Sequence, residues 1–220
     1  MYKKDYKKVY KDIYIPTTKP MLINIPCINY IIVEGKGDPN KKQGEYAESI
    51  KLLYSLSYNI KMSKMGKNKI EGYFEYVVPP LEGLWWIKGD KVIHGIDPTK
   101  KDELYFISMI RQPEFVTQQV FESACAEVKE KSGIETQKAK FINLEEGLCV
   151  QTMHKGPYDN EPETIKKLDE YIEENNLIND IGNKLNNGFI RRHHEIYLSD
   201  PRRTKQENLR TVLRIPVRYK

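Results

Sequence analysis

Hydrophobic and polar positions along the first half of the chain alternate like a strand in some places and recur like a helix in others. An apolar, β-branched run at 28–33 ("INYIIV") ends near Gly35 and predicts a strand. In 45–62, residues such as Leu53 and Ile60 recur at spacings of three and four, which indicates one buried face of a helix. Two more strands are predicted at 73–78, before Pro79-Pro80, and at 103–110. The first half therefore predicts a β-α-β-β unit.

The same order of elements is predicted again in the second half. A connecting helix is expected at 113–131, with Pro113 in its first turn and Gly133 at its end. A strand, a helix and two strands follow, at 147–153, 163–176, 191–199 and 209–218. The pattern predicts an α+β fold of tandem β-α-β-β units.

A weak internal similarity supports two related units. "VEGKGDPN" (33–40) resembles "MHKGPYDN" (153–160), and the same shift lays "FEYVVPP" (74–80) over "HEIYLSD" (194–200). The second overlay places Glu75 opposite Glu195. We expect one domain over 21–220, made of units at about 21–111 and 140–220. Two units packed together would leave a cleft at their junction.

Composition favours a cytosolic protein over a nucleic-acid-binding or membrane protein. The net charge is +5, but the basic residues are spread out, and no helix-turn-helix, zinc-finger or RNA-binding pattern is present. No apolar run approaches the roughly 20 residues of a membrane span. Cys27, Cys125 and Cys149 lie far apart, which is typical of a reducing compartment. The basic segment 1–20 is predicted to be a solvated lead-in.

Glu195 is the most unusual residue of the predicted strands, because glutamate is depleted in strands. His193 and Tyr197 lie two residues away on either side, so all three side chains should point to the same face. The residues alone favour an edge glutamate that pairs with Arg191 or Arg203.

Aromatic and soft side chains near the predicted strands are candidate ligand contacts. Trp85 and Trp86 are adjacent, so on an extended segment one should face the cleft and the other the opposite side. Tyr105 and Met109 share one face of their strand and are predicted to line the cleft. Two loop residues, Tyr158 and Glu82, complete the predicted ligand contacts.

Signals for cofactors and metals are weak. The histidines do not have metal-ligand spacing; they stand at positions 94, 154, 193 and 194. "GKG" at 35–37 is not a phosphate-binding loop, and neither a G-x-S-x-G motif nor a catalytic cysteine signature occurs. We therefore expect no cofactor and no metal.

The chain resembles a known family. The tandem units with an acid in "HHEIYLSDPRRT" (193–204), together with "PPLEGLWW" (79–86), are similar to the GyrI-like small-molecule-binding domain, the effector-binding domain of many AraC-type and MerR-type regulators. The two motifs resemble a free-standing branch that hydrolyses cyclopropane-bearing DNA alkylators. The resemblance implies a pseudo-twofold axis and a central cleft. It also implies that Glu195 lies at the base of an aromatic pocket for cationic or aromatic molecules.

These expectations lead to a functional hypothesis. The protein should bind a hydrophobic, partly planar small molecule and hydrolyse it, with Glu195 as the base that activates water. Burial in an aromatic cleft raises the pKa of a carboxyl toward neutrality, which suits proton transfer. His193 or Tyr197 would stabilise the developing negative charge. The main alternative is a module that binds such a molecule without chemistry. A third hypothesis is an inhibitor of a protein partner. Because no DNA-binding segment accompanies the domain, a transcription factor is not expected.

Overall fold

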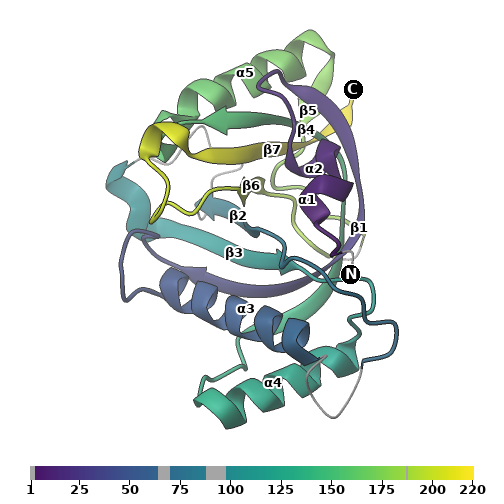
Figure 1. Cartoon of the computed structure of the whole chain (residues 1–220). Helices are drawn as coiled ribbons and strands as arrows, with labels where there is room; N and C mark the ends of the chain where they lie inside the picture. Colours follow the sequence, from purple (N-terminus) through teal and green to yellow (C-terminus); the bar gives the residue numbers. More distant parts are fainter. Residues whose placement is uncertain (1–2, 64–69, 88–97, 187) are drawn as a thin grey trace.

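The strands close into a ring. The computed structural model describes residues 3–63, 70–87, 98–186 and 188–220. In this part of the chain, the strands form one sheet in the order β4-β1-β3-β2-β6-β7-β5, and an additional pairing of β4 with β7 closes the ring (Figure 1). The strands are β1 (Met21–Lys36), β2 (Leu81–Ile87), β3 (Leu104–Arg111), β4 (Ala139–Lys155), β5 (Leu177–Asn179), β6 (His193–Tyr197) and β7 (Arg210–Tyr219).

The two halves of the ring are built alike, which confirms the predicted tandem units. β1 pairs with β4, and β2 pairs with β6, all antiparallel, so the two units meet along two ladders. Within each unit the remaining strand, β3 or β7, lies between the other two. Gly37 (φ 126°) and Gly156 (φ 121°) follow the first strand of each unit in a conformation that favours glycine.

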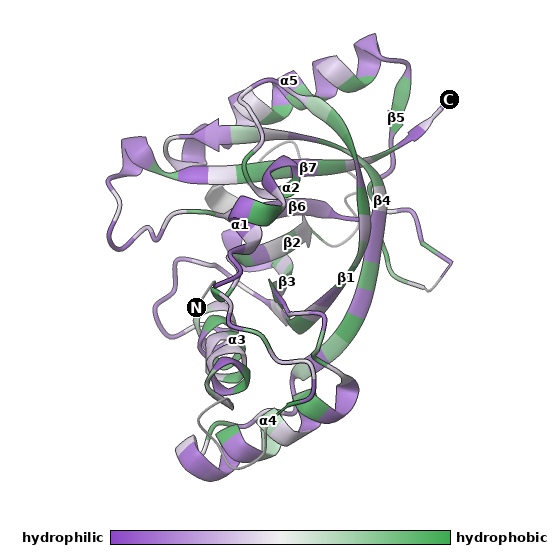
Figure 2. Cartoon of the chain, turned by 45° about the vertical axis from the view of Figure 1, so that its right-hand side comes forward, coloured by the Kyte–Doolittle hydropathy of each residue, from purple (hydrophilic) through white to green (hydrophobic). Residues whose placement is uncertain are grey.

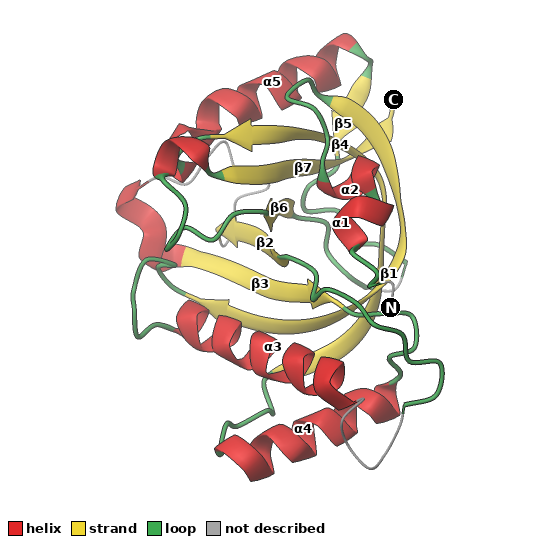
Figure 3. Ribbon diagram, in the orientation of Figure 1, coloured by secondary structure: helices red, strands yellow, loops and turns green. Residues whose placement is uncertain are grey.

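The long helices lie outside the ring (Figure 3). Helix α3 (Glu45–Met62) packs on β1 and β3, and helix α5 (Glu161–Glu174) packs on β4 and β7. Helix α4 (Gln118–Ser132) connects the units and packs against α3. It begins at Gln118, capped by the Thr117 side chain, and ends at the predicted Gly133. The predicted start at Pro113 was therefore five residues early.

Strand parity separates an inner from an outer hydrophobic cluster. Tyr30, Met109 and Val212 point into the ring, whereas Ile31 packs under α3 and Leu213 under α5. Figure 2 shows hydrophobic stretches along β1, β4 and β7, and mostly hydrophilic turns on α4. Both faces of most strands are therefore buried. None of the helices in the described ranges is long and apolar enough to cross a membrane.

The N-terminal segment is not a solvated lead-in, so that expectation was wrong. Its short helices α1 (Tyr6–Val9) and α2 (Lys11–Tyr14) join the inner cluster, where Tyr6 and Tyr14 are fully buried. The main-chain N–H of Met153 donates to the carbonyl of Thr17 (2.9 Å), which fixes the end of the segment on β4. The segment closes one side of the ring interior.

The predicted strand at 73–78 is also wrong. In that stretch only Tyr76 forms a bridge, to Lys4 of the N-terminal segment. The second strand of the first unit is β2, within "PPLEGLWW". The residue directly opposite Glu195 in the β2–β6 ladder is Gly83, and Glu75, its match in the sequence overlay, lies outside the strands.

Candidate functional site

Glu195 lies at the centre of a buried hydrogen-bonded chain on the outer face of the sheet. The residue is 4% exposed. The hydroxyl of Tyr197 donates to Glu195 Oε2 (2.7 Å), and the indole N–H of Trp85 donates to the Tyr197 hydroxyl oxygen (2.8 Å). His193 Nε2 lies 3.3 Å from Glu195 Oε1. The shared face of the three β6 residues, predicted from strand parity, is confirmed.

Neither arginine proposed as an alternative partner contacts Glu195. Arg191 donates to Asp180 (2.6 Å), and Arg203 lies 3.8 Å from Asp200. Glu195 thus accepts a hydrogen bond from the Tyr197 phenol and lies beside the His193 imidazole, and neither of these arginines pairs with it.

Aromatic rings surround this chain. The ring of Tyr46, at the start of α3, lies 5.2 Å from that of Trp85 and 5.1 Å from that of Phe106, centroid to centroid. The ring of Tyr158 meets that of Tyr197 edge-on at 6.0 Å. We call Trp85, Tyr46, Tyr158 and Tyr197 the aromatic cage. Of the two tryptophans, Trp85 is the one on this face.

A second acid, Glu161, belongs to the same site and was missed in the sequence. It is the first residue of α5, is 5% exposed, and its Oε1 has no hydrogen-bond partner within the described structure. Burial raises its pKa well above the usual range, and the charges of Glu195 and Asp159 raise it further. The only sequence signal was an acid directly before the predicted helix, which is common at helix starts.

The cage tyrosines stay protonated at neutral pH. Burial, followed by the charges of Glu161 and Glu195, raises the pKa of Tyr158 to about 12. Burial and the Glu195 carboxylate raise the pKa of Tyr197 well above its ordinary value. Burial likewise raises the pKa of Tyr46. The phenols are therefore hydrogen-bond donors and not bases.

Four of the predicted ligand contacts, Trp86, Tyr105, Met109 and Glu82, lie on the opposite face of the sheet from Glu195. Met109 is fully buried in the inner cluster, and Tyr105 stacks on Trp86 (5.7 Å between centroids). Glu82 also points inward. The interior accommodates these side chains because the closed ring buries both faces of β2 and β3.

Glu82 belongs to a buried ionic network inside the ring. The two nitrogens of the His194 ring lie 3.0 Å from Glu82 and 2.9 Å from Glu146. Arg214 donates to Glu146 (2.7 Å), and the hydroxyls of Tyr14 and Tyr30 donate to Glu82. Burial alone would raise the pKa of Glu146, but His194 and Arg214 lower it to about 2. Glu82 and Glu146 therefore point inward because this network binds their carboxylates.

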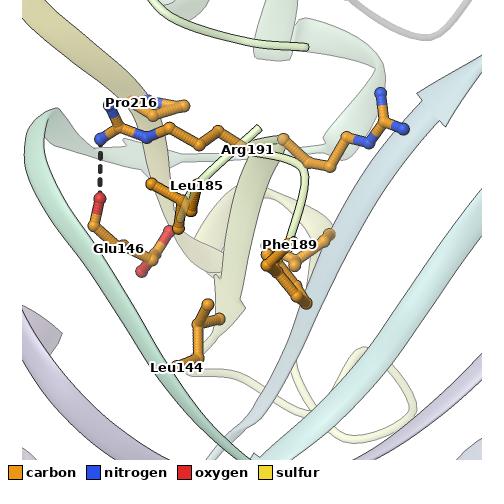
Figure 4. Close-up of a pocket in the computed structure, with 8 residues that line it drawn as sticks. Leu144, Glu146, Leu185, Phe189, Arg191 and Pro216 are labelled. Atoms are coloured by element: carbon orange, nitrogen blue, oxygen red, sulfur yellow. Dashed lines mark hydrogen bonds between the residues drawn. The ribbon is translucent and has the colours of Figure 1, made fainter. Parts of the chain in front are cut away.

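A small cavity lies beside this network. It measures about 10 Å³, and Leu84, Glu146, Phe189 and Arg191 are among its lining residues (Figure 4). Arg191 crosses it and donates to the main-chain carbonyl of Glu146 (2.7 Å). The cavity has room for about one water molecule and shares no residue with the aromatic cage.

In the described ranges, no group of three or more His, Cys, Asp or Glu residues could hold a metal ion. Of the predicted non-ligand histidines, His154 contacts Thr164 and the carbonyl of Pro157, and His94 lies outside the described residues.

Comparison with known families matches this architecture. The model of the GyrI-like small-molecule-binding domain matches residues 18–218. The chain belongs to this family. The expected GyrI-like family and fold are thereby confirmed, and the family's description makes small-molecule binding the general role.

Solved structures agree with the family assignment. A hydrolase from Listeria innocua is 41% identical, with a TM-score of 0.85, over 98% of this chain and all of its own. An uncharacterized conserved protein from the same organism is 42% identical, with a TM-score of 0.88 and the same coverage. The C-terminal domain of EcmrR, at 14% identity and a TM-score of 0.51 over 92% of this chain and 98% of its own, shares the fold. No curated protein matches the chain.

Proposed function

We propose that this GyrI-like protein binds a hydrophobic, partly planar small molecule in the aromatic cage and hydrolyses electrophilic cyclopropanes by adding water. The observation that carries the proposal is a buried carboxylate, Glu195, oriented by Tyr197 inside a set of aromatic rings. The 41% identical relative described as a hydrolase supports chemistry in addition to binding.

Glu195 serves as the general base in this proposal. For a cyclopropane fused to a dienone, Glu195 takes a proton from water while the water oxygen bonds to the ring methylene. The carbon–carbon bond between that methylene and the dienone ring breaks, and its electron pair moves to the distant carbonyl oxygen. That oxygen then takes a proton, and the product differs from the substrate by one added water. Tyr197 fixes the orientation of the base, which favours a productive geometry.

The aromatic cage supplies the binding surface. The faces of Trp85 and Tyr46 suit a flat polycyclic ligand. Because Glu195 is only 4% exposed, a ligand must displace part of the cage to reach it. Tyr158 is the mobile candidate, since it is partly exposed and follows directly after Gly156-Pro157.

The test is the Glu195→Gln variant. Mass spectrometry should detect a product heavier by one water after incubation of the wild type with a cyclopropane-fused dienone. Loss of the general base should lower the rate about 10²- to 10⁴-fold. Binding, followed by quenching of Trp85 in a Trp86→Phe background, should persist. Turnover by Glu195→Gln at the wild-type rate would rule out the mechanism.

The exposed neighbour of the inner network, Glu145, provides a matched control. Glu145→Gln makes the same chemical change away from the cage and should leave the rate unaltered. If the wild type quenches on ligand addition but forms no hydrated product, the protein is a binding module, which the family's description favours.

A further inference from the structure

We infer that Glu161 is a second catalytic acid, which donates a proton to the oxygen of the bound molecule that gains negative charge. The inference rests on the proposed function and extends it, because that function leaves the source of this proton open. Two carboxyl groups in one buried site can divide the work only if one is charged and the other neutral.

Glu161 has hydrogen-bonding capacity that the described residues leave unused. Its side chain is 5% exposed, and Oε1 has no hydrogen-bond partner in the part of the chain that the structure describes. A buried polar atom without a partner costs free energy. A ligand oxygen in the cage would supply the missing partner.

The surroundings of Glu161 favour its neutral form. The start of α5 alone would stabilise a negative charge. Burial opposes this effect, and so do the two acids that act on Glu161. The titratable groups around the site come from β6 and the turn after it, the turn before α5, α3 and the segment before β3; they are His193, Glu195, Tyr197, Asp200, Tyr158, Asp159, Tyr46 and Lys101. The two basic side chains of this set lie on the other acids: Lys101 is 3.8 Å from Asp159, and His193 Nε2 is 3.3 Å from Glu195 Oε1. Within the described residues, no ion pair joins either of them to Glu161. Repulsion and burial therefore outweigh the effect of the helix start, and Glu161 keeps its proton.

The two acids then complete one proton circuit. Glu195 gains the proton that water loses, and Glu161 gives its proton to the carbonyl oxygen that receives the electron pair. After the step Glu195 is neutral and Glu161 is charged. A proton passing from Glu195 to Glu161, directly or through water, restores the starting state without an external acid.

Infrared spectroscopy of the ligand-free protein tests the protonation state directly. At pH 7 the wild type should show the carbonyl stretch of a neutral carboxylic acid, and Glu161→Gln should lack it. Glu163→Gln, which alters an exposed acid two residues along the same helix, should retain the band. A wild type without the band, or a band that survives in Glu161→Gln, overturns the inference.

Kinetics test the catalytic role. Glutamine can donate a hydrogen bond but cannot release a proton, so Glu161→Gln should keep ligand quenching and lose about 10²- to 10⁴-fold in kcat. The wild-type rate should fall at alkaline pH as Glu161 loses its proton, and this fall should be absent from the pH–rate profile of Glu161→Gln. Wild-type turnover with an unaffected Glu161→Gln overturns this inference alone. If the wild type has no turnover, the proposed function fails and takes the catalytic role with it, while the infrared band still reports whether Glu161 is neutral.

Discussion

Gly83 shapes the site from the strand opposite Glu195. A Cβ atom at this position would lie 2.7 Å from Trp85 Nε1 and 3.2 Å from the Tyr197 hydroxyl. Both atoms belong to the hydrogen-bonded chain that holds Glu195, so an added methyl group must push them apart.

Gly83→Ala should therefore disturb the site more than the fold. We expect a cost of about 1–3 kcal/mol in the free energy of unfolding, as is typical of overpacking. Trp85 fluorescence should shift in the Trp86→Phe background, and ligand quenching should weaken. Circular dichroism should show unchanged secondary structure. Wild-type ligand affinity in Gly83→Ala would contradict the importance of this contact.

Strand parity predicted part of the site, because it depends only on local geometry. It placed His193, Glu195 and Tyr197 on one face and separated Trp85 from Trp86. It could not select the correct face of 104–111, since the sheet closes on itself and both faces of that strand are apolar. Glu161 was not predictable, because its place beside Glu195 depends on how α5 lies across the sheet.

The N-terminal segment is an integral element of the inner core. Tyr14 is fully buried, and its hydroxyl donates to Glu82 Oε1 (3.3 Å). Tyr14→Phe removes this donor and leaves a buried carboxylate less satisfied, at a cost of about 1–3 kcal/mol. Urea unfolding monitored by circular dichroism measures the change.

Tyr58→Phe is the control for this experiment, since Tyr58 is 49% exposed. It should unfold within about 0.5 kcal/mol of the wild type. Equal effects of the two variants would show that the inward hydroxyl does not stabilise the fold.

Most elements were predictable because their hydrophobic periods are regular. The predicted helix at 45–62 matches α3 (Glu45–Met62), and the last predicted strand lies within one residue of β7. The failure lay in the first unit. "YFEYVV" alternates like a strand, but its backbone pairs only at Tyr76. The true strand, β2, contains Glu82 and Gly83, two residue types that strands disfavour.

At the scale of the whole molecule, the ionic network inside the ring makes stability depend on acid. Folding lowers the pKa of Glu146 from 4.5 to about 2. Because this pKa is lower in the folded state, the carboxylate stabilises the fold at pH values above its unfolded-state pKa. The contribution is lost as the pH falls through the folded-state pKa. Wild-type stability should therefore decline between about pH 4.5 and pH 2.

Glu146→Gln should remove this contribution. It leaves Arg214 and His194 without their shared carboxylate, so we expect a loss of about 3–5 kcal/mol at pH 7. Below pH 4.5 the variant should show a flatter decline than the wild type. The exposed neighbour variant Glu145→Gln should follow the wild-type curve. Urea titrations at several pH values test both, and parallel curves for wild type and Glu146→Gln would contradict this account.

The closed ring has a consequence for the origin of the site. Each unit alone would leave two strand edges unpaired, and these are the edges that the other unit covers. Two copies of a half-length ancestor could close the same ring. In such a symmetric dimer, however, a residue next to the twofold axis would face the same residue of the other copy. Glu195 would face a second glutamate. When α4 joins the two halves in one chain, one half can keep the acid while the other carries Gly83. The asymmetric site therefore requires the fused chain.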